Sequence, residues 1–332
     1  MHTTKKLLAG LATVFIGFGS AMAQSATTTA DAKLNFPTKP VRLVVPFPAG
    51  GTVDGVARTL GPELAAAIGQ SVVIENRGGA GGSIGAGLVA QAQPDGHTLL
   101  LVLDTHAINP LVYKTLSYDT DKDFAPISLI ARAPMVAVAT NNFPANDIQE
   151  LIEYAKKKPD HVNYASVGAG SASHLTAELF NQAAGVSMVH IPYKGGSQAM
   201  TDLIGGQVEI QWGTVPYVQA MVKSGKLKAL GQTGETRSQV FPELKTVSEQ
   251  GLGGIDAYGW VGLLAPAGTP PEILVYWHDT LKKVVNSAAV SNRLTSEGFD
   301  VMLNTPEEFR KFVNDEQGKW NRLIQERQIQ LQ

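Results

Sequence analysis

Residues 41–54 read VRLVVPFPAGGTVD, and this stretch decides the fold that we expect. An apolar run typical of a β-strand ends at Pro46, and a glycine pair at positions 50 and 51 leads into a helical pattern. The first N–H groups of a helix lack partners within the helix, and the helix dipole is positive at this end. We therefore predict a strand–loop–helix unit whose loop binds an anion, and similar units recur further along the chain.

The composition indicates a globular protein and excludes several classes of function. The chain has 332 residues, enough for two domains, and 44% of them are hydrophobic while 17% are charged. A formal net charge of −2 argues against nucleic acid as a partner. Cysteine is absent, which excludes disulfides and any metal site or nucleophile that needs a thiol.

The N-terminus has the pattern of a cleavable signal peptide. Two lysines precede an apolar run over residues 7–18, and Ala21-Met22-Ala23 has the small–x–small pattern of a cleavage site. The apolar run is too short to span a bilayer comfortably. We expect residues 1–23 to be a signal peptide that directs the protein to the periplasm, and residues 24–35 to be a flexible segment.

The order of the expected elements indicates an α/β fold with two lobes. Strands that lead through loops into helices, one unit after another, favour a parallel sheet with right-handed crossovers. Two long apolar extensions, residues 124–140 and 258–265, interrupt this rhythm and are predicted to cross between the lobes. We expect domain 1 to comprise residues 36–130 and 260–332, and domain 2 residues 131–259, with a cleft at the carboxyl ends of the strands.

The remaining expected elements follow from hydrophobic periodicity and from turn residues. Residues 104–110 are expected to form a loop. Further strands are expected at residues 41–45, 71–74, 98–103, 162–166, 188–191, 208–212, 227–232 and 300–303. Helices are expected at residues 53–68, 83–92, 147–157, 173–184, 271–286, 290–297 and 306–327, with a short helix from residue 197 and another that starts near Pro216.

Four glycine-rich loops join expected strands to expected helices. They are residues 48–54, 77–83, 167–173 and 193–197. Glycines also permit tight turns without any ligand, so one such loop alone is a weak indication. Four of them, divided between the two expected lobes, favour a shared ligand site.

Enzyme motifs are weak or absent. Ser83 lies in a Gly-x-Ser-x-Gly pattern, but the expected strand ends about seven residues earlier, too far for the sharp turn of a hydrolase nucleophile. The sequence has no Walker motif, no Gly-x-Gly-x-x-Gly and no close pair of histidine ligands. We expect no catalytic residue, no cofactor and no metal; an exported serine hydrolase that uses Ser83 with His106 or His174 is kept as an alternative.

Aromatic side chains near the expected cleft allow two interpretations. Phe47 and Trp212 end their strands and could either stack on a flat ligand or cover the core of a lobe. His106 could donate a hydrogen bond to a ligand or bond within its own loop. His174 and Glu178 are four residues apart in an expected helix, and we expect them to form a pair on the solvent side.

Charged residues in the glycine loops have different expected roles. Arg77 and Lys194 are the cations of these loops, and either could pair with a carboxylate, although Lys194 is expected to be solvated. Asp54 would repel an anionic ligand. We therefore expect Asp54 to hold the loop in place or to organise water and cations.

Seven stretches together resemble the Bug family, the TctC-like periplasmic substrate-binding proteins of tripartite tricarboxylate transporters. The resemblance covers nearly the whole chain after the signal peptide. It implies a type II-like periplasmic-binding-protein fold, in which two α/β domains joined by two crossings close like a Venus flytrap. The stretches are PFPAGGTVD (46–54), ENRGGAGGSIGA (75–86), PDGHTLLL (94–101), THAINPLVY (105–113), YASVGAGSASHL (164–175), VHIPYKGGSQAMTDLIGGQVE (189–209) and GWVGLLAPAGTPPEIL (259–274).

This resemblance also implies a function. Such proteins capture a small carboxylate and deliver it to inner-membrane transporter subunits, holding its oxygens with loop N–H groups, hydroxyls and waters. The expected ligand is a di- or tricarboxylate, with an aromatic dicarboxylate such as terephthalate as one candidate, and the protein is expected to be a monomer. A ligand sensor for a membrane signalling receptor is the alternative, because it would use the same closure.

The expected ligand-binding residues include loop residues carried over from the family. One departure lies at Gln211-Trp212-Gly213-Thr214, where members often read Met-Phe-Asp-Asn; losing an acid and gaining an indole suits a less polar or aromatic carboxylate. Pro48 and Asp54 also carry over, with Asp54 as a residue that frames the site or organises water. The ligand-binding set is Phe47, Ala49, Gly50, Gly51, Thr52, Ala80, Gly81, Gly82, Thr105, His106, Gly168, Ala169, Gly170, Ser171, Tyr193, Trp212 and Thr214.

Overall fold

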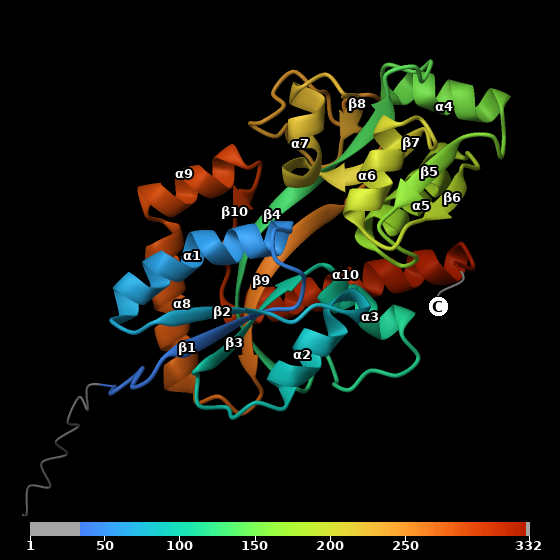
Figure 1. Cartoon of the computed structure of the whole chain (residues 1–332). Coiled ribbons are helices and arrows are strands. Elements are labelled where there is room, and N and C mark those ends of the chain that lie inside the picture. Colours follow the sequence, from blue (N-terminus) through green and yellow to red (C-terminus); the bar gives the residue numbers. More distant parts are fainter. Residues whose placement is uncertain (1–33, 330–332) are drawn as a thin grey trace, which may run out of the picture. The chain divides into compact units, whose positions relative to one another are not determined.

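A 17-residue strand, β4 (Phe124–Thr140), is shared by the two halves of a mixed sheet. Its first part pairs antiparallel with β9 (Tyr258–Pro266), and the two strands run side by side in Figure 1. Its second part pairs antiparallel with β7 (Ile210–Thr214) and β8 (Leu227–Gln232). The two apolar extensions predicted from the sequence are these two strands, β4 and β9, and both are buried along almost their whole length.

The structure is a computed structural model that describes residues 34–329. The expected signal peptide and most of the expected flexible segment lie outside the described residues. The other strands are β1 (Val41–Val45), β2 (Val72–Asn76), β3 (Thr98–Leu103), β5 (Asn163–Ser166), β6 (Val189–Pro192) and β10 (Asp300–Val301). The helices are α1 (Thr52–Ile68), α2 (Ser83–Ala90), α3 (Thr105–Val112), α4 (Ile148–Lys157), α5 (Ala172–Ala184), α6 (Gly196–Ile204), α7 (Val215–Lys223), α8 (Pro271–Val285), α9 (Ala288–Ser296) and α10 (Pro306–Glu326), with a 3₁₀ turn, η1 (Ala80–Gly82).

The strands follow the spatial order β2-β1-β3-β9-β4-β7-β5-β6, with β8 and β10 also paired to β4. Strand β1 is parallel to β2 and β3, and β5 is parallel to β6 and β7. We call lobe 1 the part built on β1–β3, β9, β10 and residues 124–134 of β4. Lobe 2 is the part built on β5–β8 and residues 135–140 of β4. The mixed α/β fold is confirmed, while the predicted domain boundaries stay a prediction.

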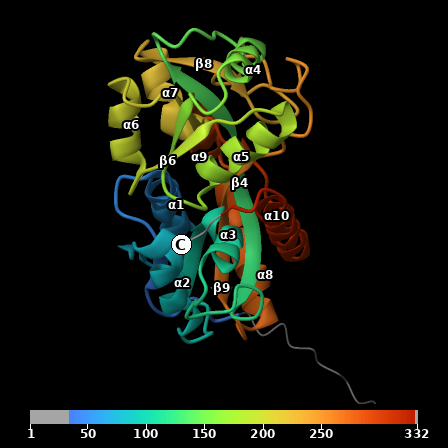
Figure 2. The ribbon, with the colours of Figure 1, turned by 90° about the vertical axis from the view of Figure 1, so that its right-hand side faces the viewer.

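Each lobe buries both faces of its strands under helices, which is why most of the strands are apolar on both sides. In lobe 1, α1, α8 and α9 cover one face, where Trp277 is fully buried, and α2 and α10 cover the other, where Trp260 packs edge-on against Phe309. Figure 2 shows α1 and α10 on opposite sides of β4 and β9. In lobe 2, α4 and α5 lie over one face, and α6 and α7 over the other.

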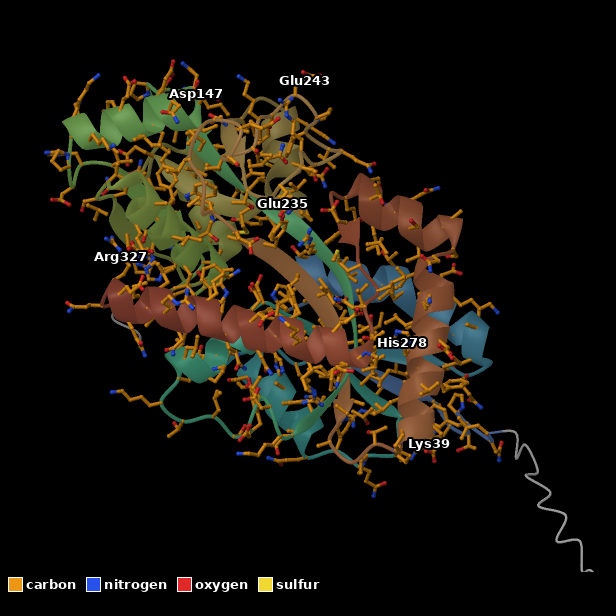
Figure 3. All side chains as sticks on the ribbon, turned by 180° about the vertical axis from the view of Figure 1, so that it is seen from behind. Lys39, Asp147, Glu235, Glu243, His278 and Arg327 are labelled. Carbon is orange, nitrogen blue, oxygen red and sulfur yellow. The ribbon has the colours of Figure 1, made fainter. Side chains whose placement is uncertain are left out.

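Helix α10 contacts both lobes. A capping box between Thr305 and Glu308 begins the helix, and Phe309 packs into the core of lobe 1. Further along, Trp320 packs with residues of lobe 2. Just after the helix, Arg327 bonds to a carboxylate of α5, and Figure 3 shows Arg327 at this end of α10.

Two local expectations were wrong. Residues 104–110 were expected as a loop, but α3 covers Thr105–Val112, because a row of buried side chains compensates for the poor helix former Pro110. Strand β2 continues to Asn76, two residues beyond its expected end, because Glu75 and Asn76 pair with β1. No helix within residues 34–329 is long and apolar enough to cross a membrane.

Candidate functional site

The loop after β1 is held by the carboxylate of Asp54, which is 1% exposed. Its Oδ2 accepts hydrogen bonds from the Gly50 N–H and from Arg58 Nε, both at 2.8 Å, and its Oδ1 accepts one from Asn76 Nδ2 at 2.9 Å. Burial raises the pKa of Asp54, but the bonds from Arg58, Gly50 and Asn76 together lower it below its usual value. Asp54 is therefore an ionised part of the frame of this loop.

The donors that this loop offers belong to the N-terminus of α1. The helix begins after Gly51 without a side-chain cap. Within residues 34–329, the N–H groups of Thr52, Val53 and Asp54 have no hydrogen-bond acceptor. Gly50 and Gly51, which precede these donors, are exposed and have no side chains. A carboxylate placed here would meet several N–H groups and the positive end of the helix dipole.

The loop after β2 touches the first loop because it has no side chains there. A Cβ on Gly82 would lie 3.2 Å from the ring of Phe47, and one on Gly78 would lie 3.0 Å from Pro48. From α3, the Asn109 Nδ2 donates to the carbonyl of Gly81 at 3.1 Å and holds this loop. Asn109 had not been predicted as a site residue, because it is a lone amide in a segment expected to be a loop.

The arginines beside these loops are already paired with a carboxylate of the protein, so they are not free to bind a ligand carboxylate. Arg77 Nε donates to Glu75 Oε1 at 2.6 Å, and Arg42 Nη2 donates to Oε2 of the same carboxylate at 2.7 Å. The bonds from Arg42 and Arg77 lower the pKa of Glu75, so the three groups form a charged cluster. Lys194 is exposed, as expected.

In lobe 2, the loop after β5 closes around the carbonyl of Gly168. The Gly168 carbonyl accepts from Ser166 Oγ at 3.0 Å, Ser171 Oγ at 2.6 Å and Ser171 N–H at 3.1 Å. The Gly168 and Gly170 φ angles of 137° and 74° suit glycine at both positions. Ser171 caps α5, and its hydroxyl hydrogen goes to Gly168, so it is not free for a ligand in this structure.

The donors left in this loop are again at a helix N-terminus. The Gly170 N–H is taken by His174 Nδ1 at 3.0 Å. Among the described residues, the N–H groups of Ala169, Ala172 and Ser173 have no acceptor. Both lobes therefore present uncompensated backbone donors at the start of a helix that follows a parallel strand.

Two expected ligand contacts lie in the core instead. Trp212 is 0% exposed and packs against Phe180 of α5 at a ring-centroid distance of 5.5 Å, so it cannot stack on a ligand in this structure. His106 is 4% exposed between Tyr118 and Phe124, and burial lowers its pKa to about 4. The cause is the same in both cases: the side chain points from its strand or helix toward packed elements.

The pair expected on the solvent side is also buried. His174 is 4% exposed and Glu178 is 8% exposed, because α5 packs between β7 and the end of α10. Helical spacing alone did not indicate which face of α5 is covered.

The two lobes meet at Gly259 on β9. A Cβ on Gly259 would lie 2.3 Å from Thr214 Cγ2 and 3.4 Å from Asp104 Oδ2, so the ends of β7 and β3 are close neighbours here. Thr105 begins α3 and Thr214 precedes α7 at this point. Tyr193 belongs to lobe 2 and its carbonyl lies 3.7 Å from a Cβ built on Gly168, so these two loops adjoin each other.

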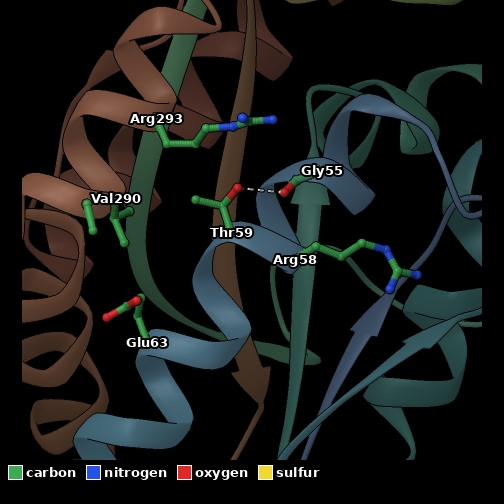
Figure 4. Close-up of a pocket in the computed structure, with 7 residues that line it drawn as sticks. Gly55, Arg58, Thr59, Glu63, Val290 and Arg293 are labelled. Carbon is green, nitrogen blue, oxygen red and sulfur yellow. Dashed lines mark hydrogen bonds between the residues drawn. The ribbon is translucent and has the colours of Figure 1, made fainter.

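A cavity of about 480 Å³ lies elsewhere, between α1 and α9 (Figure 4). We do not assign the ligand to it, because both of its guanidinium groups are already paired: Arg58 with Asp54 at 2.8 Å and Arg293 with Glu297 at 2.6 Å. No group of three His, Cys, Asp or Glu side chains in the described part of the chain is arranged to hold a metal ion. The cavity is lined by Gly55, Arg58, Thr59, Glu63, Ala289, Val290 and Arg293.

A family model described as the tripartite tricarboxylate transporter family receptor matches residues 56–329. The chain belongs to this family. It is therefore a receptor of the TctC and Bug type, a binding protein and not an enzyme, and the serine-hydrolase alternative is dropped.

Solved structures of similar proteins agree with this family. The periplasmic binding protein BugD is 37% identical, with a TM-score of 0.80 over 90% of this chain and 100% of that chain. Rpa4515 of R. palustris, solved with adipate, is 34% identical, with a TM-score of 0.81 over 87% of this chain and 97% of that one. MatC from Rhodopseudomonas palustris, solved with bound malate, is 34% identical, with a TM-score of 0.78 over 87% and 100%.

Proposed function

We propose that this TctC-type receptor binds a small aliphatic dicarboxylate between its two lobes and delivers it to the membrane subunits of a tripartite tricarboxylate transporter. One observation carries the proposal: α1 in lobe 1 and α5 in lobe 2 each begin with N–H groups that have no acceptor within residues 34–329. Two separate donor sets match a ligand with a carboxylate at each end. The relatives solved with adipate and with malate hold ligands of this kind.

The charges around the loops support a ligand held by backbone donors. Asp54 already pairs with Arg58, and Glu75 pairs with both Arg42 and Arg77, so the loops offer dipoles and not an unpaired guanidinium. Charge-assisted bonds to backbone N–H groups are about twice as strong as neutral ones. Closure of the lobes would remove water from these bonds and strengthen them further.

The structure favours an aliphatic over an aromatic dicarboxylate. The expectation of an aromatic ligand depends on Trp212 at the ligand, and this indole is fully buried against Phe180. Phe47 lies against Gly82 and so supports the neighbouring loop. A flat ligand such as terephthalate therefore cannot use Trp212 as a stacking partner.

A ligand screen tests the proposal. We expect malate, adipate or a related dicarboxylate to raise the midpoint of thermal unfolding, because a ligand bound only by the folded state stabilises it. Adipamide, which has the same chain but no charge, is the matched control and should give no shift. If no carboxylate shifts the midpoint, or if adipamide shifts it as much as adipate does, the proposal is wrong.

Delivery and location belong to the same proposal. We propose a periplasmic monomer, because the family is one of periplasmic binding proteins and the N-terminal pattern predicts export. Uptake of labelled dicarboxylate by cells that carry the transporter should stop when this gene is deleted. Unchanged uptake, with loss of a transcriptional response to the ligand, would instead favour the sensor alternative.

Asp54 should control affinity without touching the ligand. Asp54→Asn replaces one acceptor oxygen by an amide that faces the donors Gly50 N–H and Arg58, so the loop loses its frame. We expect roughly a 10- to 100-fold weaker dicarboxylate affinity, the effect of losing one charged hydrogen bond. Titration calorimetry with the dicarboxylate found in the screen measures it. Glu63→Gln, an exposed carboxylate on the same helix, should leave the affinity unchanged.

A further inference from the structure

Two histidine rings are stacked behind the amide-presenting loop of lobe 2. His174 on α5 and His190 on β6 are 3.7 Å apart between ring centroids, with an interplanar angle of 8°. The ring of Tyr164 on β5 extends the stack, 5.1 Å from His190. Parallel rings at this distance lie close enough that a proton on one would repel a proton on the other.

Each histidine contacts one side of the loop, and the hydrogen bond from Gly170 assigns the proton of His174. The Gly170 N–H can only donate, so His174 Nδ1 accepts it, and the His174 proton lies on Nε2. Ser166 Oγ lies 3.0 Å from the Gly168 carbonyl and 2.6 Å from His190 Nε2, and its single hydroxyl hydrogen can go to either of them. His174 is neutral in this arrangement, because its Nδ1 is an acceptor.

We propose that His174, with His190 stacked on it, is a positioning residue for ligand binding: it holds the loop so that the N–H groups of Ala169, Ala172 and Ser173 face the ligand. The proposal rests on the proposed function, since it assumes that this loop binds a carboxylate. His174 itself takes no part in the contact, because its free acceptor is used by Gly170.

The geometry explains why an acceptor is needed at this point. Gly170 is buried, so without His174 its N–H would have no partner, and a buried donor without a partner costs free energy. The loop could avoid that cost only by rotating the peptide between Ala169 and Gly170. Such a rotation would change the backbone angles of Ala169 and Gly170 and move the neighbouring N–H groups away from their present directions.

The stack also faces groups that set its protonation. Burial, with the nearby His190 as the second cause, lowers the pKa of His174 to about 4, although Glu178 acts in the opposite direction. Glu178 is held by the Tyr164 hydroxyl at 2.6 Å and by Arg327 Nη2 from α10 at 2.9 Å. At neutral pH the pair is therefore neutral, and only acid converts His174 Nδ1 from an acceptor into a donor that opposes Gly170.

Two variants of His174 separate positioning from packing. His174→Asn can keep an acceptor near the position of Nδ1, whereas His174→Phe keeps the stacked ring and loses the acceptor. We expect affinity for the dicarboxylate found in the screen, with malate and adipate as first probes, to fall at least 10-fold in His174→Phe and less than 3-fold in His174→Asn. Equal loss in both variants, or no loss in His174→Phe, would overturn the proposal.

Two further readouts extend the test, and the first of them needs no ligand. The backbone amide NMR signal of Gly170 should shift upfield in His174→Phe, because the hydrogen bond is lost, and stay near its wild-type position in His174→Asn. The ratio of wild-type to His174→Asn affinity, in which ligand protonation cancels, should fall as pH drops from 6 toward 4. If the amide behaves as expected but no carboxylate binds, the proposed function fails; if the amide is unmoved in His174→Phe, the positioning role fails.

Discussion

Asp104→Asn should stabilise the protein at pH 8 by up to about 4 kcal/mol and leave its stability unchanged below about pH 4. Burial, with the nearby Glu316 as the second cause, raises the pKa of Asp104 from 3.8 to about 7. A carboxyl whose pKa is higher in the folded state gives its full stability below the unfolded value of 3.8, and this contribution is lost as the pH rises through 7. Asparagine stays neutral and can still accept a hydrogen bond from the Thr105 N–H.

Urea unfolding at pH 4, 6 and 8 measures the effect of Asp104→Asn. The difference from wild type should grow across this range, because each pKa unit corresponds to about 1.4 kcal/mol. Asp279→Asn, a carboxylate with a side chain that is 72% exposed on α8, is the control and should show no such trend. A variant that is less stable than wild type at pH 8 would show that ionised Asp104 is needed for the fold.

Arg327→Met should destabilise the protein by about 2–3 kcal/mol. Arg327 Nε and Nη2 both bond to Glu178 Oε2, at 3.1 and 2.9 Å, and the Glu178 side chain is 11% exposed. Removing the cation leaves a buried carboxylate held only by Tyr164 and Asn181, and breaking a buried pair typically costs 3–5 kcal/mol. We expect less here because the Arg327 side chain is 33% exposed.

A double-mutant cycle checks that this loss comes from the pair. Adding Glu178→Gln to Arg327→Met removes the unpaired charge, so the double variant should recover part of the stability in urea unfolding. Lys311→Met, which breaks an exposed pair with Asp315 on the same helix, should change stability by less than about 1 kcal/mol. Additive effects of the two substitutions would mean that Arg327 acts through packing alone.

The fold could be predicted closely where the sequence pattern has one explanation. The apolar extension at residues 124–140 coincides with β4, because no helix of that length would be apolar on all sides in a soluble lobe. Helix α3 was missed because its stability comes from tertiary burial of Ile108 and its neighbours, while Pro110 signals the opposite locally. Local patterns cannot include contacts made with distant segments.

The positions of the glycine loops could be predicted from the sequence, but the burial of the side chains around them could not. The glycine loops and the frame role suggested for Asp54 follow from backbone chemistry, which acts within a few residues. Trp212 and His174 depend on which face of a strand or helix another element covers, and one sequence does not state this. The hydrogen bond from Asn109 to Gly81 joins residues that are 28 positions apart, so no local sequence pattern predicts it.

The place of β9 in the sheet also sets the order in which the chain can fold. Strand β9 lies between β3, which ends at Leu103, and β4, so lobe 1 lacks a central strand until Pro266 has been synthesised. Strands β5–β8 all precede β9, so lobe 2 has its strands earlier. Pairings between such distant segments form slowly, because a long loop must close first. During synthesis, lobe 2 therefore has all its strands while lobe 1 still lacks β9.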